Sequence, residues 1–102
     1  MTPKNYTVMA IMKAQPGKES ELKQVLAESL VPSHPEDACI EYRLHQDSNN
    51  SAIFFLYENW KSKELHQQQF QKPYVVSLIK KLDDLLVKPS QGFYAHDEIQ
   101  AQ

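Results

Sequence analysis

One strand with two apolar faces constrains the fold of this chain more than any other feature. Residues 52–60 (AIFFLYENW) are rich in aromatic and β-branched side chains, which is typical of a β-strand. Side chains alternate sides along a strand, so the two faces carry Ile53, Phe55 and Tyr57 on one side, and Phe54, Leu56 and Trp60 on the other. A strand that is apolar on both sides needs cover on both sides. We expect the chain's own helices to cover one face and a second sheet, from another subunit, to cover the other.

Two further segments alternate with the period of a strand. Residues 6–14 end at the turn Gln15-Pro16-Gly17, and residues 39–46 lead through five polar residues, 47–51, into residues 52–60. Strands joined in this way predict an antiparallel hairpin. A last short strand is predicted over residues 92–96.

Two regions carry apolar residues at helical spacing. The first stripe is Leu22, Val25, Leu26, Ser29 and Leu30, and Pro32 and Pro35 are expected to end its helix. Ser62 can cap a short helix over about residues 63–71, and Pro73 suits the first turn of the next. That last helix has the broader stripe, Val75, Val76, Leu78, Ile79, Leu82, Leu85 and Leu86. The order β-α-β-β-α-β predicts an α+β, ferredoxin-like fold with an antiparallel sheet.

Length and charge limit the classes of protein that fit. The 102 residues suit a single domain, with a core over about residues 6–95 and a tail over 96–102. A formal net charge of −2 without a basic face argues against a nucleic-acid partner. The first apolar run is broken by Lys13, and Cys39 is the single cysteine, so we predict a cytoplasmic protein with no membrane partner.

No pattern predicts a metal or a cofactor. The histidines are His34, His45, His66 and His96, and none has a second ligand at metal-binding spacing. The only glycines, Gly17 and Gly92, cannot form a phosphate-binding loop. We therefore expect no metal and no nucleotide cofactor.

A run of motifs resembles one known family. Cys39-Ile40-Glu41-Tyr42 is followed by the polar hairpin and then by residues 55–64 (FLYENWKSKE). This order is similar to that of the antibiotic biosynthesis monooxygenase family, in which a Gly-Cys and a Tyr precede F-x-L-Y-E-x-W at the start of a helix. The resemblance extends from Tyr6 to about Tyr94. It implies a homodimer in which two sheets pack face to face into a dimeric α/β barrel.

The resemblance also implies a range of activities. Members include cofactor-independent monooxygenases acting on anthrone-like or quinol substrates, haem-degrading enzymes, enzymes that process signalling molecules, and proteins with no known activity. The leading hypothesis is a monooxygenase that oxidises a small phenolic, anthrone-like or quinol substrate with dioxygen. The alternatives are a non-catalytic dimeric small-molecule-binding or inactive member, and an isomerase or decarboxylase on a related barrel.

The sequence departs from the family pattern at three places. Many members carry a His nine residues after the Trp, where this chain has Gln69. His66 lies three residues earlier on the same helix and could replace that group. Ala38 stands where the family usually has Gly, and Ala10 where the haem-degrading members need an Asn, so haem degradation is not favoured.

Three residues are the catalytic candidates, and each has a structural alternative. His66 could accept a proton from an acidic phenol or quinol, or be a solvated residue in a run of glutamines. Gln69 could orient a substrate oxygen but cannot take a proton. Trp60 could line the pocket between sheet and helices, or serve as a packing anchor.

Four more residues are candidates for substrate binding. Tyr42, Tyr57 and Tyr74 could each supply a phenolic hydroxyl, although core packing is the default for each. Glu58 shares a face with Leu56 and Trp60, and a buried carboxylate there would need a partner such as Arg43. The alternatives for Glu58 are a structural pair of this kind, which could lie at the dimer interface, and a catalytic acid.

Overall fold

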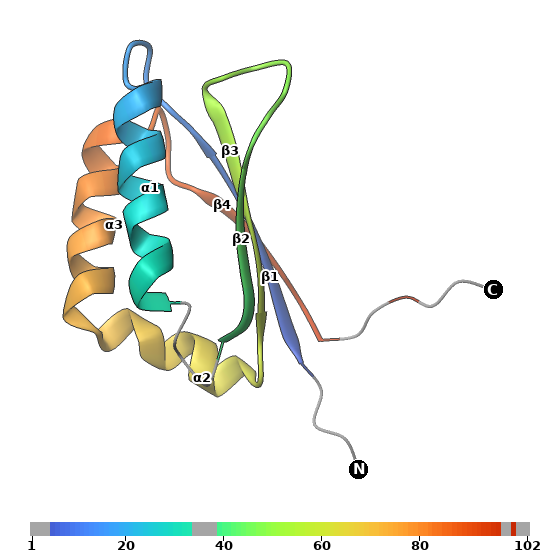
Figure 1. Cartoon of the computed structure of the whole chain (residues 1–102). Helices are drawn as coiled ribbons and strands as arrows, with labels where there is room; N and C mark the ends of the chain where they lie inside the picture. Colours follow the sequence, from blue (N-terminus) through green and yellow to red (C-terminus); the bar gives the residue numbers. More distant parts are fainter. Residues whose placement is uncertain (1–4, 34–38, 97–98, 100–102) are drawn as a thin grey trace.

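The protein has one antiparallel sheet with helices on one side. The computed structural model describes residues 5–33, 39–96 and 99, and of residues 29–33 only the backbone. Its elements are β1 (Tyr6–Lys13), α1 (Glu19–Ser33), β2 (Cys39–Gln46), β3 (Ile53–Trp60), α2 (Lys63–Gln68), the 3₁₀-helix η1 (Gln69–Gln71), α3 (Pro73–Leu85) and β4 (Gln91–Ala95). The four strands lie in the order β2-β3-β1-β4, and every pair is antiparallel. The helices stack against a single face of this sheet (Figure 1). The expected α+β ferredoxin-like fold is therefore confirmed.

The helix ends follow from local sequence chemistry. Gly17 has φ +84°, a left-handed conformation that favours glycine, and α1 begins two residues later. Its last described residue is Ser33, so Pro32 lies within its final turn, and Pro35 lies outside the described residues. The Ser62 hydroxyl accepts a hydrogen bond from the Leu65 backbone N–H at 3.1 Å and so caps α2.

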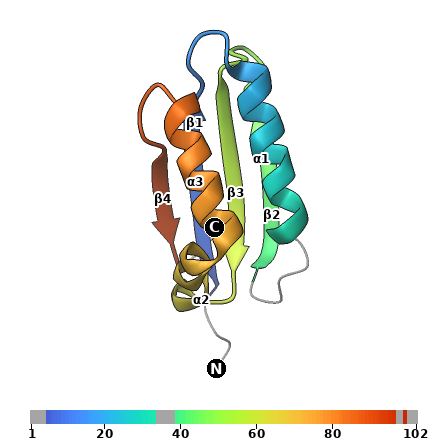
Figure 2. The same cartoon turned by 90° about the vertical axis from the view of Figure 1, so that its left-hand side faces the viewer.

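The predicted helix over residues 63–71 is α2 continued by η1. Lys72 then turns to an extended conformation (ψ 137°), as the residue before a proline prefers, and Pro73 opens α3. This break gives α2 and α3 different directions, and together they pass along one side of the sheet (Figure 2). Among the described residues, no helix is long and apolar enough to cross a membrane.

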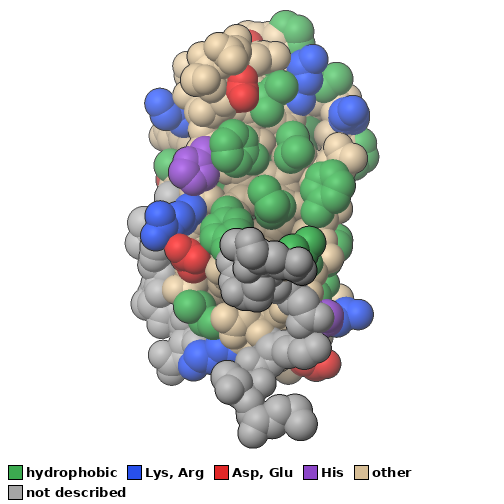
Figure 3. Space-filling view, turned by 90° about the vertical axis from the view of Figure 1, so that its right-hand side faces the viewer, with side chains coloured by type: hydrophobic (Ala, Val, Ile, Leu, Met, Phe, Trp, Pro, Cys, Tyr) green, Lys and Arg blue, Asp and Glu red, His purple; other side chains and the backbone are tan. Residues whose placement is uncertain are grey.

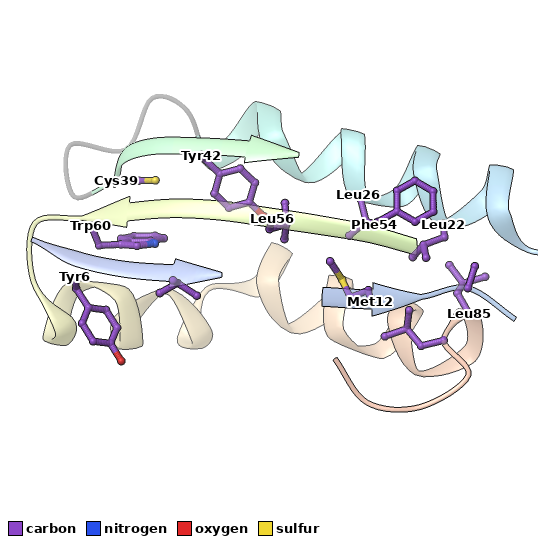
Figure 4. Packing of buried hydrophobic residues seen from close by; sticks show 13 residues of the cluster. Tyr6, Met12, Leu22, Leu26, Cys39, Tyr42, Phe54, Leu56, Trp60 and Leu85 are labelled. Atoms are coloured by element: carbon purple, nitrogen blue, oxygen red, sulfur yellow. The ribbon is translucent and has the colours of Figure 1, made fainter. Parts of the chain in front are cut away.

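The core lies between the sheet and the helices. The least exposed large side chains are Phe54, Leu22 and Leu26, which gather at one end, and Trp60, which lies at the other (Figure 4). Met12 and Leu85 join the first group, whereas Tyr6 and Cys39 lie near Trp60 (Figure 4). The core thus consists of two packed ends along the same face.

The opposite side of the sheet carries an apolar surface that no helix or strand among the described residues covers. We call it the open face, and its apolar side chains are Met9, Ile11, Ile53, Phe55, Tyr57 and Phe93. Figure 3 shows hydrophobic side chains gathered on this face. Met9, Ile11 and Phe93 are 44%, 40% and 50% exposed. The expectation that residues 52–60 present two apolar faces is confirmed, because Phe54, Leu56 and Trp60 are buried on the other side.

Two sequence expectations fall on positions that the structure does not describe. Ala38 is one of them. The predicted tail is the other, since of residues 97–102 only Ile99 is described, and it is 96% exposed.

Candidate functional site

A cavity of about 170 Å³ lies between the sheet and the helices. We call it the sheet–helix cavity. Its apolar walls come from β1, β3, η1 and α3, and include Met12, Leu56, Phe70, Val75 and Leu82. Its polar lining residues are Tyr42, Glu58, His66, Gln69, Tyr74, Ser90 and Tyr94. Because these polar groups come from both layers, the site exists only once the helices dock on the sheet.

One row of residues across the sheet forms the polar side of this cavity. Tyr42 pairs with Glu58, Glu58 with Val8, and Val8 with Tyr94, so the row crosses all four strands. Directly paired residues of antiparallel strands point to the same face. Their side chains therefore reach the helix side together, although the four residues are far apart in the sequence.

The neighbouring row makes the empty space. Leu56 pairs with Ala10, and Ala10 with Gly92, so two small residues lie beside each other in the cavity wall. A Cβ built on Gly92 would lie 2.6 Å from the Tyr94 hydroxyl oxygen. The absence of a side chain at position 92 thus lets the Tyr94 ring fold back across β4. Neither Ala10 nor Gly92 was predicted as a site residue from the sequence, because only the pairing of β4 with β1 brings the two together in the cavity wall.

Glu58 is buried, and its partner is not the one expected. It is 6% exposed, and the Trp60 indole N–H donates a hydrogen bond to its Oε1 at 2.8 Å. Burial raises the pKa of Glu58 to about 7, although the hydrogen bond from Trp60 acts in the opposite direction. The carboxyl group thus changes its charge near neutral pH.

The expected Glu58–Arg43 pair is wrong. Arg43 is opposite Tyr57 on the open face, where its Nε lies 2.9 Å from Glu41 Oε1. An irregularity between Cys39 and Glu41 shifts the register of β2, so Tyr42, rather than Arg43, shares a face with Glu58. Alternation within β2 alone could not reveal this.

His66 is a buried residue, so the expectation of a solvated position is wrong. Its ring packs against Tyr6 and Trp60 with centroids 5.4 Å away in each case, and against Phe70 at 5.3 Å. Its Nδ1 is buried and has no hydrogen-bond partner within the described part of the chain. Burial lowers the pKa of His66, so the imidazole is neutral at physiological pH. An unsatisfied buried polar atom beside a cavity is suited to binding a ligand group.

Five of the seven predicted site residues meet in the sheet–helix cavity. They are Tyr42, Glu58, His66, Gln69 and Tyr74. Trp60 is 1% exposed and lies behind Glu58 rather than in the lining, which agrees with a packing anchor. Tyr57 points to the open face, where its hydroxyl accepts a hydrogen bond from Asn59 Nδ2 at 2.8 Å. The structure therefore separates Tyr57 from the other candidates.

The rim and the charge of the cavity limit what it can bind. Phe70 of η1, Ile79 of α3 and Tyr94 of β4 are 46%, 42% and 59% exposed at its edge. The described lining contains one carboxylate, Glu58, and neither Lys nor Arg. Among the described residues, no group of three or more His, Cys, Asp or Glu side chains could hold a metal ion. A cavity of roughly 150 Å³ is enough to hold benzene, so about one aromatic ring fits here.

Comparison with known proteins identifies the family. The sequence model described as antibiotic biosynthesis monooxygenase matches residues 5–81. The chain belongs to the antibiotic biosynthesis monooxygenase family. The resemblance of residues 39–64 to this family is therefore confirmed.

Known structures share the fold of this family member. PA3566 from Pseudomonas aeruginosa superposes with a TM-score of 0.89 at 22% identity, over 97% of this chain and 99% of that one. Rv0793 from Mycobacterium tuberculosis gives a TM-score of 0.86 at 20% identity, over 96% and 99% of the two chains. A candidate antibiotic biosynthesis monooxygenase from Nitrosomonas europaea gives 0.87 at 14% identity, over 95% and 93%.

A sequence relative is longer than this family member. An uncharacterized protein of Synechocystis is 30% identical over 80 residues, which are 78% of this chain and 54% of the relative. The chain thus spans about half the length of that curated relative.

Proposed function

We propose that this protein is a cofactor-independent monooxygenase that oxidises a small phenol or quinol with dioxygen. The observation that carries the proposal is the partly open, mainly apolar cavity in which Glu58, His66, Gln69 and three tyrosines present polar groups. A deprotonated, electron-rich ring can itself supply the electrons that dioxygen needs. The protein then has to exclude water, hold the ring and stabilise its negative charge.

The proposed reaction balances without another reductant. A ring carbon that carries a hydrogen, para to the hydroxyl of a phenol or ortho to a hydroxyl of a quinol, becomes a carbonyl by taking one atom of dioxygen. The second oxygen atom leaves as water with two substrate hydrogens, one from that carbon and one from the hydroxyl. The product is a quinone, and the four electrons that reduce dioxygen come from the substrate.

The lining residues have separate parts in this proposal. The unpartnered Nδ1 of His66 can donate to or accept from the substrate oxygen, depending on the tautomer. Gln69 is 8% exposed and can orient the same oxygen or the carbonyl of the product. The cavity volume of about 170 Å³ favours a single-ring substrate over a three-ring anthrone.

We also propose that a second copy of this chain covers the open face. Isolated apolar residues are common on protein surfaces, but a contiguous apolar cluster marks an interaction surface. The open face carries such a cluster, and proteins of this family are often dimeric. Light scattering should then give twice the mass of the 11.8 kDa chain, and a stable monomer at micromolar concentration would contradict the dimer.

A binding protein without catalysis is the second candidate function. It is favoured by Gln69, which lines the cavity but cannot exchange a proton. The substitution Gln69→His distinguishes the monooxygenase from the binding protein. A monooxygenase should gain oxygen consumption from the added imidazole, whereas a binding protein should gain none.

Oxygen uptake by chelator-treated protein tests the proposed function. The panel is hydroquinone, a naphthohydroquinone and anthrone, each corrected for spontaneous autoxidation. We expect uptake proportional to protein concentration, without added flavin, haem or metal, and fastest with the single ring. Equal rates with and without protein across the panel would exclude the monooxygenase and leave the binding protein.

A further inference from the structure

Glu58 has an unusual setting for a buried carboxylate. It lies in the middle of the row that crosses the sheet, with Tyr42 on one side and Val8 on the other. Buried carboxylates are normally paired with a cation. The described lining of the sheet–helix cavity contains no Lys and no Arg, and Arg43 lies on the opposite face. The donor that the structure shows for the Glu58 carboxylate is therefore a neutral one, the Trp60 indole N–H.

Apart from β3, which carries Glu58, each element around the cavity contributes a tyrosine, a histidine or no titratable side chain. Tyr42 comes from β2, His66 from α2, Tyr74 from α3 and Tyr94 from β4, whereas β1 contributes only apolar residues. On its own strand Glu58 has the Trp60 indole, which holds Oε1. No other formal charge in the described lining competes with Glu58 for a proton from a ligand.

We infer that Glu58 takes the proton from the substrate hydroxyl, and that the cavity admits hydroxyarenes only in their uncharged form. This inference rests on the proposed function, to which it adds a proton acceptor and a substrate class. An uncharged ring can donate its hydroxyl hydrogen to the carboxylate. A ring that already carries a carboxylate or phosphate would place a second negative charge beside it.

The proton transfer moves one charge without changing the total. The O–H bond of the substrate breaks, an O–H bond forms on Glu58, and the electron pair stays on the substrate oxygen. The negative charge thus passes from the carboxylate to the ring, where dioxygen can react with it. Because the net charge of the cavity is the same before and after, no solvent ion has to enter.

Glu58 is a better acceptor than His66. A shared proton goes to the group with the higher proton affinity. Burial raises the pKa of Glu58 to about 7 and lowers that of His66, because burial disfavours the charged form of each. His66 therefore stays neutral and can hydrogen-bond the substrate oxygen while Glu58 takes the proton.

Binding of two matched ligands tests the inference without any oxidation. The ligands are 4-methylphenol, which stays uncharged from about pH 6 to 8.5, and 4-hydroxybenzoate, whose carboxylate is ionised over that range. As the pH rises through 7 and Glu58 ionises, we expect binding of 4-methylphenol to tighten severalfold. Binding of 4-hydroxybenzoate should weaken about tenfold or more. Both titrations can be followed by the fluorescence of Trp60, the one tryptophan of the chain.

The variant Glu58→Gln should remove both pH dependences, because an amide does not titrate in this range. It is close in shape, and its amide oxygen can still accept the Trp60 hydrogen bond, so the fold should persist. Glu58→Asp keeps a carboxyl group and should restore the opposite trends in part. Unchanged trends in Glu58→Gln would overturn the inference, and so would a wild-type protein that binds neither ligand or binds both without a pH dependence.

Kinetics with hydroquinone separate this inference from the proposed function. In Glu58→Gln the kcat for oxygen uptake should fall by about 100-fold or more, with KM changed far less, which is the usual effect of removing an acid–base group. A kcat within twofold of wild type would overturn the role of Glu58. If the wild-type protein consumes no oxygen but shows the two opposite binding trends, the oxidation fails while the charge selectivity of the cavity stands.

Discussion

The two faces of the sheet are built from alternate residues of the same strands, yet they differ in their exposure and in the partners of their charged groups. On the helix side the row Tyr42, Glu58, Val8 and Tyr94 lines a cavity with one unpaired carboxylate. One residue earlier along β3, the neighbouring row points to the open face. It consists of Arg43, Tyr57, Met9 and Phe93, which are paired side by side across the four strands. There the charged group is paired with Glu41 and the rest are apolar. One face therefore carries the cavity on which the proposed function rests, and the other carries the apolar surface on which the proposed dimer rests.

Two adjacent phenylalanines give the largest expected difference between the faces. Phe54 is 1% exposed on the helix side, so Phe54→Ala should lower the free energy of unfolding by about 3–5 kcal/mol. Phe55 lies half-buried on the open face and stacks on His45 with centroids 5.2 Å apart, so Phe55→Ala should cost the monomer about 1 kcal/mol. Urea unfolding of both variants at low concentration measures this contrast. Equal losses would show that the open face is already covered within one chain.

The pH dependence of stability should also distinguish Glu58. Its pKa is raised from 4.5 to about 7 by folding, so the folded state binds the proton more tightly than the unfolded state. The contribution of Glu58 to the free energy of unfolding should then decrease as the pH rises from 4.5 to 7. By pH 7 and above, the total decrease should reach up to about 3 kcal/mol. His66, whose pKa is lowered by burial, acts in the opposite sense below its usual value of 6.5, where its contribution rises with pH.

Thermal unfolding of Glu58→Gln, compared with that of wild type, isolates the contribution of Glu58 to the pH dependence of stability. His66 is the same in both proteins and cancels in their difference. We expect the variant to gain in relative stability from pH 4.5 to 8. A difference that does not change with pH would mean that Glu58 titrates alike in the folded and unfolded states.

A charge on the open face should weaken the proposed dimer. Ile11 is 40% exposed there, and Ile11→Lys should raise the dimer dissociation constant about tenfold or more, because a buried lysine lacks a partner. Val76 on α3 is 41% exposed and supplies a control with the same change of charge. Sedimentation should find the Val76→Lys protein still dimeric. Dissociation of both variants alike would place the interface elsewhere.

The smallest expected effect concerns the rim of the cavity. A Cβ at position 92 would meet the end of the flexible Tyr94 side chain, so Gly92→Ala should change stability by less than about 0.5 kcal/mol. Because Tyr94 must move, KM for hydroquinone should change severalfold. Gly17→Ala is the contrasting variant, since φ +84° strains any side chain there and should cost about 1 kcal/mol without altering KM.

The elements were predictable because each depends on local pattern. Alternation in residues 6–14 and 52–60, the cap at Ser62 and the proline at position 73 all act within a few residues. The pairing of Glu58 with Arg43 failed because a register shift in β2 is a property of two strands together. The burial of His66 was missed for a related reason. A short helix with many glutamines has no clear apolar stripe, and its orientation is set by contact with Tyr6, Trp60 and Phe70.

The sequence by itself determined the order of the elements, the two apolar faces of β3 and the motif that marks the family. It also placed Glu58 and Trp60 on the same side of their strand, because the alternation of side chains has a fixed period of two. Only the tertiary structure decided which residues of β2 and β4 share that side, and therefore that Tyr42 and Tyr94 flank the carboxylate. The physical reason is that the register between strands depends on contacts between distant segments, and those contacts form only when the sheet and helices pack together.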